Sequence, residues 1–93
     1  MLAARLPHAL FVAPDGSEPC DMAPYGRQWF SLQDRRPAVI LAGARRTAPL
    51  LDAYLDELLQ RHGLDETSMA LVGFSQGTMM SLFTGPRRPR PPA

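Results

Sequence analysis

Two short apolar runs stand out in the hydrophobic pattern of this 93-residue chain. The first covers residues 9–13 and is closed by Pro14-Asp15-Gly16, and the second covers residues 69–73. A continuous apolar run of this length, bounded by turn residues, is typical of a strand that is buried on both faces of a sheet. The pattern therefore predicts two fully buried strands.

Between these runs, an amphipathic pattern predicts a helix of roughly fifteen residues that begins near Thr47, a residue that can cap it. Glu57 precedes Arg61 by four residues, which is the favourable order for a helical ion pair, and Gly63 provides the C-terminal stop. A shorter helix is expected over residues 37–44. The apolar face of the main helix is marked by leucines at helical spacing, Leu51, Leu55, Leu58 and Leu59.

A strand, a crossover that contains a helix and a second buried strand make a β-α-β unit with parallel strands and a right-handed connection. Another helix is expected after the second run, and Gly85-Pro86 should end it. We therefore predict an α/β fold, with a partial domain over residues 1–84. Residues 85–93 are rich in proline and arginine and are expected to form an extended or disordered tail.

Composition and charge exclude several classes of function. With 45% hydrophobic and 20% charged residues, the chain is globular in character. A net charge of +1 gives no strong attraction to nucleic acid or to an anionic membrane. No apolar run approaches the about 18 residues of a membrane span, and the N-terminus lacks a secretory cleavage site. The single cysteine, Cys20, fits a reducing compartment, so we expect a cytoplasmic protein.

The candidate chemistry lies at Gly73-Phe74-Ser75-Gln76-Gly77, which matches G-x-S-x-G. Between a buried strand and a helix, this pattern indicates a nucleophile elbow, in which the serine sits on a sharp, strained turn and glycines let neighbouring backbones approach closely. Ser75 is the predicted nucleophile. The backbone N–H of Gln76 is a predicted oxyanion-hole donor, aided by the helix N-terminus. The alternative is an ordinary strand-to-helix turn whose glycines serve only the backbone.

Residues 69–80, and ALVGFSQGTMM in particular, resemble the nucleophile segment of the phospholipase/carboxylesterase family, which is related to the acyl-protein thioesterases. The stretch FVAPD at 11–15 and the loop ending in GRQWF at 26–30 follow the order of its bacterial carboxylesterase branch. The resemblance covers most of positions 5–83. It implies a serine hydrolase that acts on small carboxylic esters, thioesters or lysophospholipids without a metal or cofactor.

The resemblance also implies that Trp29 and Phe30, in an aromatic-rich segment without periodicity, line the groove for the acyl or alcohol group. The alternative is that these two side chains fill the core of their own loop.

The sequence departs from the family pattern where the rest of the catalytic machinery is expected. Family members begin with a His-Gly loop that supplies a second oxyanion donor, and nothing before Leu6 resembles it. Their Asp and His follow the serine, but here no Asp, Glu or His follows Glu66, and His8 and His62 both precede Ser75. We therefore expect a fragment of a serine carboxylesterase that is marginally folded or aggregation-prone, and catalytically silent by itself.

Two other classes of function stay open at this point. One is a degenerate, non-catalytic interaction domain that retains part of the fold. The other is a carrier for the proline-arginine tail, which would act as a docking motif.

Overall fold

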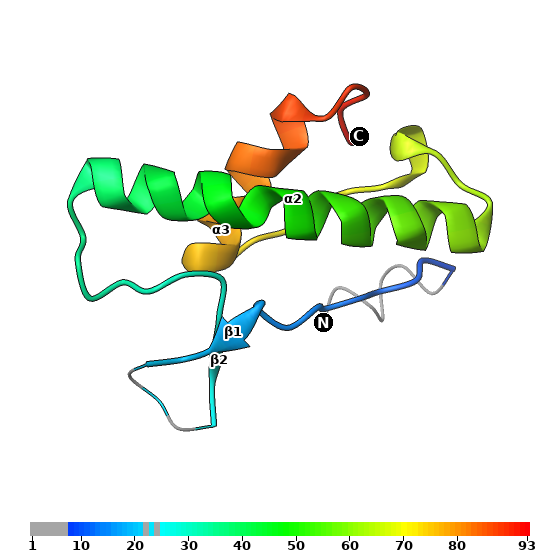
Figure 1. The fold of residues 1–93 in the computed structure, drawn as a ribbon. Coiled ribbons are helices and arrows are strands. Elements are labelled where there is room, and N and C mark those ends of the chain that lie inside the picture. Colours follow the sequence, from blue (N-terminus) through cyan, green and yellow to red (C-terminus); the bar gives the residue numbers. More distant parts are fainter. Residues whose placement is uncertain (1–7, 22, 24) are drawn as a thin grey trace.

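A computed structural model describes residues 8–21, 23 and 25–93. Residues 1–7, where the sequence lacks a His-Gly loop, lie outside the described part. The elements in chain order are strands β1 (Glu18–Pro19) and β2 (Arg27–Gln28), helix α2 (Pro37–His62), 3₁₀ turn η1 (Glu66–Ser68), helix α3 (Gln76–Thr84) and 3₁₀ turn η2 (Gly85–Arg87) (Figure 1). No helix within these described ranges is long and apolar enough to cross a membrane.

Helix α2 is longer than the sequence predicted, because the two expected helices are one continuous helix of 26 residues. It begins at Pro37, where a fixed φ suits the first turn and the missing N–H costs little. Thr47 lies inside the helix, where its buried hydroxyl donates to the Gly43 carbonyl at 2.8 Å, so its predicted capping role is wrong. Pro49 is also internal, and burial on both sides of it, at Ala44 and Leu51, keeps the helix continuous despite the lost backbone hydrogen bond.

The C-terminal end of α2 is as predicted. Gly63 adopts the left-handed conformation with φ 64° and ψ 35°, and its N–H donates to the Gln60 carbonyl at 3.2 Å. Glycine enters this region without the steric cost that a Cβ brings, which is why it ends so many helices. One turn earlier, Glu57 and Arg61 form the expected ion pair.

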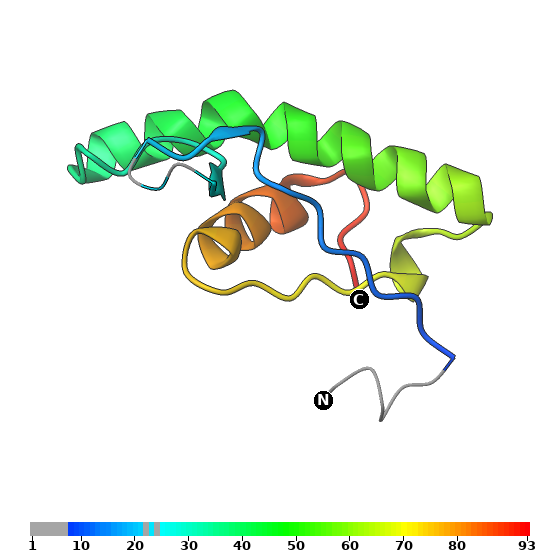
Figure 2. The ribbon, with the colours of Figure 1, turned by 90° about the horizontal axis from the view of Figure 1, so that it is seen from below.

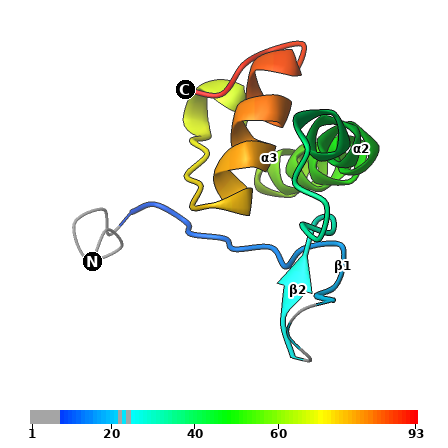
Figure 3. The same ribbon diagram turned by 90° about the vertical axis from the view of Figure 1, so that its left-hand side faces the viewer.

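The core lies between α2 and α3, which pack against each other. Figure 3 looks almost along α2 and shows α3 crossing beside it. The core also takes one side chain from the loop before α2. Its buried apolar members are Phe30, Ala44, Ala48, Leu51, Leu55 and Met80.

The predicted parallel β-α-β unit is not formed in the part of the chain that the structure describes. Residues 9–13 and 69–73 belong to no strand there, and β1 and β2 form a short antiparallel pair instead. Both runs appear in Figure 2 as chain without regular structure, beneath α2. The first run is exposed along its length, with Leu10 at 65%, whereas in the second run Val72 is 82% exposed but Met69 and Leu71 are partly buried against the core. A strand needs a neighbouring strand for its backbone hydrogen bonds. These two runs do not pair with each other, and instead they line a common cavity of about 720 Å³.

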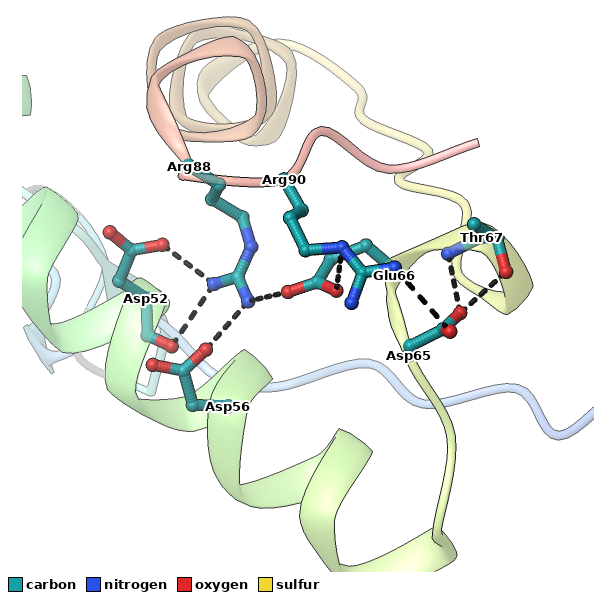
Figure 4. Close-up of polar contacts among 7 residues, drawn as sticks. All are labelled: Asp52, Asp56, Asp65, Glu66, Thr67, Arg88 and Arg90. Carbon is teal, nitrogen blue, oxygen red and sulfur yellow. Dashed lines mark hydrogen bonds and ion pairs between the residues drawn. The ribbon is translucent and has the colours of Figure 1, made fainter.

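The C-terminal segment also differs from the disordered tail that its composition predicted. The side chain of Arg88 is only 2% exposed, and its guanidinium donates to Asp52 and Asp56 of α2 and to Glu66 of η1, at 2.7, 2.6 and 3.3 Å (Figure 4). Beyond it, the Ala93 N–H donates to the Glu66 carbonyl at 3.2 Å. Burial by itself lowers the pKa of Arg88, but the hydrogen bonds to Asp56 and Asp52 raise it above its usual value. The ordering comes from carboxylates on distant elements, which the composition of the tail does not reveal.

Candidate active site

Ser75 occupies a strained turn at the N-terminal cap of α3. Its backbone has φ 54° and ψ −119°, and among the described residues no other non-glycine residue has a positive φ. A side chain in such a sparsely populated region costs on the order of 1–3 kcal/mol. Ser75 is exposed and makes no side-chain capping bond to the helix, so its Oγ is available to a ligand.

The two glycines of the motif serve the turn differently. At Gly73 an added Cβ would lie 2.5 Å from the Thr78 backbone nitrogen, so no side chain fits there. At Gly77 an added Cβ would meet nothing within 4 Å. The expected close backbone approach is therefore found at Gly73, and the same expectation is wrong for Gly77 in this structure.

The backbone N–H of Gln76 has the freedom that an oxyanion donor needs. Gln76 is the first residue of α3, and the first N–H groups of a helix have no intrahelical acceptor. No acceptor for this N–H is found elsewhere among the residues described. The helix N-terminus also favours negative charge at this point.

The side chain of Gln76 makes a contact that the sequence did not predict. Its Oε1 accepts a hydrogen bond from the backbone N–H of Trp29 at 2.8 Å, and its Nε2 donates to the backbone carbonyl of Phe30 at 2.8 Å. The two bonds join residues 47 and 46 positions apart in the chain. Neither hydrophobic period nor motif spacing contains a signal for a contact over this range.

The structure gives different environments to the two aromatic residues of this loop. Phe30 is 1% exposed and its ring packs so closely on α2 that a Cβ at Gly43 would come within 2.7 Å of it. Phe30 therefore belongs to the core, and in this structure its side chain is not presented to a substrate. Trp29 is only partly buried and lines the 720 Å³ cavity, so it remains a candidate for substrate contact.

The same cavity is lined by Gly77 of α3 and by both histidines of the chain, His8 and His62. His62 is the last residue of α2. Figures 1 and 2 both show the C-terminal end of α2, and also the start of the described chain (dark blue), away from the N-terminal end of α3. Neither histidine is therefore brought to the turn that carries Ser75.

Comparison with known proteins shows which family the chain resembles. The sequence profile described as Phospholipase/Carboxylesterase matches residues 1–92. Esterase YpfH of Escherichia coli (strain K12) is 34% identical over 87 residues, which cover 86% of this chain and 34% of the esterase. The chain thus spans about a third of the length of this curated relative. No solved structure matches the chain.

The match over nearly the whole chain places it in a family with an α/β fold. The chain belongs to the phospholipase/carboxylesterase family, which confirms the resemblance drawn from residues 69–80.

Proposed function

We propose that this chain is the nucleophile-bearing part of a serine carboxylesterase that hydrolyses small acyl esters or thioesters through Ser75. The observation that carries the proposal is the positive φ of Ser75, inside a G-x-S-x-G turn at the N-terminus of α3. A strained conformation at an exposed serine persists only where the surrounding structure holds it, and such positions are concentrated at functional sites.

In the proposed reaction, Ser75 Oγ attacks the carbonyl carbon of the substrate while a general base removes its proton. The negative charge that develops on the carbonyl oxygen is stabilised by the Gln76 N–H and by the helix N-terminus. The leaving alcohol or thiol takes a proton from the conjugate acid of the base. Water then attacks the acyl-enzyme, which releases the carboxylic acid and restores the hydroxyl.

The base and the residue that orients it are proposed to come from outside the 93 residues, because α/β-hydrolases place Asp or Glu and then His after the serine. His8 and His62 do not substitute for them, since both lie away from the N-terminal end of α3. An unassisted serine hydroxyl is a weak nucleophile. We therefore propose that the chain is catalytically silent by itself.

The docking-tail alternative is not favoured, because the arginine at its centre, Arg88, is buried against α2 and η1 and is not presented to a partner. A non-catalytic interaction domain remains the competing outcome, and the experiment that follows separates it from the esterase.

The test is a chimera in which this chain replaces the matched stretch of Esterase YpfH. We expect the chimera to hydrolyse short p-nitrophenyl esters, and Ser75→Ala to lower kcat by about 10⁴-fold or more. Thr78→Val, which removes a hydroxyl one turn further along α3, is the matched control and should stay active. Retained hydrolysis in the Ser75→Ala variant would remove Ser75 from the mechanism, and a folded but inactive chimera would favour the non-catalytic domain.

A second measurement addresses the isolated chain. A fluorophosphonate, which reacts with activated serines, should label the chimera and leave the 93-residue chain unlabelled. Stoichiometric labelling of the purified chain, lost in Ser75→Ala, would show that a base is supplied within it or by a second copy.

A further inference from the structure

We propose that the side chain of Gln76 is a positioning residue that fastens the Trp29 loop to the N-terminal end of α3 and so sets where Trp29 stands relative to Ser75. The catalytic consequence rests on the proposed function. The contact itself does not, because it is measurable in the chain without any activity.

The carboxamide of Gln76 pairs with two successive peptide groups of the loop. It accepts from the Trp29 N–H and donates to the Phe30 carbonyl, each at 2.8 Å, which is a normal length for a well-formed hydrogen bond. Only the side chains of asparagine and glutamine present an amide donor and a carbonyl acceptor from one planar group. The loop therefore gains from Gln76 the kind of two-way pairing that a neighbouring strand would provide.

The loop has two anchors, and they reach different helices. The Phe30 side chain packs into the core against Gly43 of α2, whereas the Gln76 side chain ties the backbone to α3. Gln76 directly follows Ser75, so this second anchor is one residue from the candidate nucleophile. Trp29 lines the same cavity as Gly77. Releasing the anchor would move one wall of that cavity relative to the nucleophile.

A glutamine at the first position of a helix could instead serve the helix alone, and Gln76→Glu separates the two roles. A helix N-terminus favours a carboxylate, so a purely helical role makes this substitution neutral or stabilising. In the contact with the loop, the carboxylate keeps an acceptor for the Trp29 N–H but places a second oxygen against the Phe30 carbonyl. Two acceptors then face each other and the loop is released.

Hydrogen exchange at the backbone amide of Trp29 measures this contact directly, both in the 93-residue chain and in the chimera. Gln76→Met keeps the side-chain length but removes both hydrogen bonds, and we expect the protection of this amide to fall by about 30-fold. The Leu64 N–H, which donates to the Leu59 carbonyl at 2.9 Å at the end of α2, is the internal reference. Gln60→Met, at an exposed position of α2, is the matched control and should change neither amide.

The exchange results in the two Gln76 variants decide between the positioning role and its alternatives. A fall at Trp29 in both Gln76→Met and Gln76→Glu, with Leu64 unchanged, supports the positioning role. An equal fall at both amides indicates general destabilisation and overturns it. Protection in Gln76→Glu that matches the unmodified chain also overturns it, because the helix alone would then account for Gln76.

The effect of Gln76 on substrate selectivity is measured in the chimera. Gln76→Met should change the ratio of kcat/KM between a long and a short acyl ester by about tenfold, in the same direction as Trp29→Ala, and the two substitutions together should be less than additive. An unchanged ratio in an active chimera overturns the positioning role and leaves the Ser75 chemistry standing. An inactive chimera counts against the proposed function, while the exchange measurement still decides the contact.

Discussion

The helical part of the molecule and the two apolar runs at residues 9–13 and 69–73 are built from similarly hydrophobic sequence, yet their side chains are buried to different extents. In the helical part, Leu51 and Met80 are 6% and 1% exposed. In the runs, Leu10 and Val72 are 65% and 82% exposed. Only Met69 and Leu71 of the runs pack partly against the core, so the same kind of side chain is buried in one region and largely exposed in the other.

The difference lies in how each kind of element satisfies its backbone. A helix makes its hydrogen bonds within itself, so α2 and α3 need each other only to cover their apolar faces. A strand makes its hydrogen bonds to a neighbour, and in the described part of the chain neither run has one. The turn at Ser75 joins the two regions, and its geometry is held from the helical side, where the Thr78 N–H donates to the Ser75 carbonyl at 3.0 Å.

The largest effect is expected from truncating side chains in the two regions. Met80→Ala removes a core side chain that is 1% exposed, and it should lower the free energy of unfolding by about 2–5 kcal/mol. A loss of that size is enough to unfold a small domain of marginal stability. Val72→Ala should change the free energy of unfolding by less than about 0.5 kcal/mol, because that side chain is mostly in solvent. Urea denaturation followed by circular dichroism measures both.

Measuring Val72→Ala in the chimera as well extends this comparison. If the remainder of the hydrolase pairs with residues 69–73, Val72→Ala should become costly there, by about 1–3 kcal/mol. A cost of that size already present in the 93-residue chain would contradict the comparison, because the run would then be packed without a partner.

The next effect concerns the tail and whether it belongs to the helical part. Arg88→Met should lower the free energy of unfolding by about 2 kcal/mol, less than the loss for a fully buried ion pair, because Asp52 and Asp56 are 40% and 69% exposed. Arg90→Met, at a side chain that is 62% exposed, should cost less than about 1 kcal/mol. Urea denaturation in low and high salt measures the loss of unfolding free energy in the two variants. Equal losses for Arg88→Met and Arg90→Met would mean that the tail does not dock on α2.

A smaller effect, of opposite sign, is expected at the turn that joins the two regions. Ser75→Gly relieves the strain of φ 54° and should raise the free energy of unfolding by about 1 kcal/mol, whereas Ser75→Ala keeps the strain and should not. Thermal unfolding of the two variants, compared at equal concentration, measures the difference. If Ser75→Gly is no more stable than Ser75→Ala, the turn is not strained in solution.

The smallest effect is a pH dependence of stability at η1, which directly precedes the second run. Hydrogen bonds from the Thr67 hydroxyl and then from its backbone N–H hold the pKa of Asp65 below its usual range, with Arg90 adding to the effect. A lowered folded pKa gives a stabilisation that is present above the ordinary carboxyl pKa of about 4 and is lost as the pH falls through the lowered value.

Thr67→Ala should therefore reduce stability at neutral pH and flatten its decline in acid, and Tm measured from neutral to about pH 2 checks this. Ser68→Ala, which removes the neighbouring hydroxyl of η1, is the control and should leave the acid profile unchanged. An acid profile that is identical in Thr67→Ala and the unmodified chain would dissociate Asp65 from this contact.

Features that depend on near neighbours in the chain were predicted from the sequence. The stop of α2 at Gly63, the Glu57–Arg61 ion pair and the strained turn at Ser75 all follow from residue types at fixed short spacings. The family could be inferred for the same reason, because residues 69–80 form one contiguous segment.

Other features were decided only by the tertiary structure. The continuity of α2 through Pro49 depends on burial on both sides of it, and the order of the tail depends on carboxylates that meet Arg88 from α2 and η1. The core position of Phe30 depends on its packing against Gly43 of α2, and its contact with Gln76 joins residues 46 positions apart in the chain. The sequence by itself determined local backbone geometry, because steric limits and short-range hydrogen bonds act within a few residues. Which distant surfaces meet was set by packing, because burial and pairing are properties of the whole arrangement rather than of any one segment.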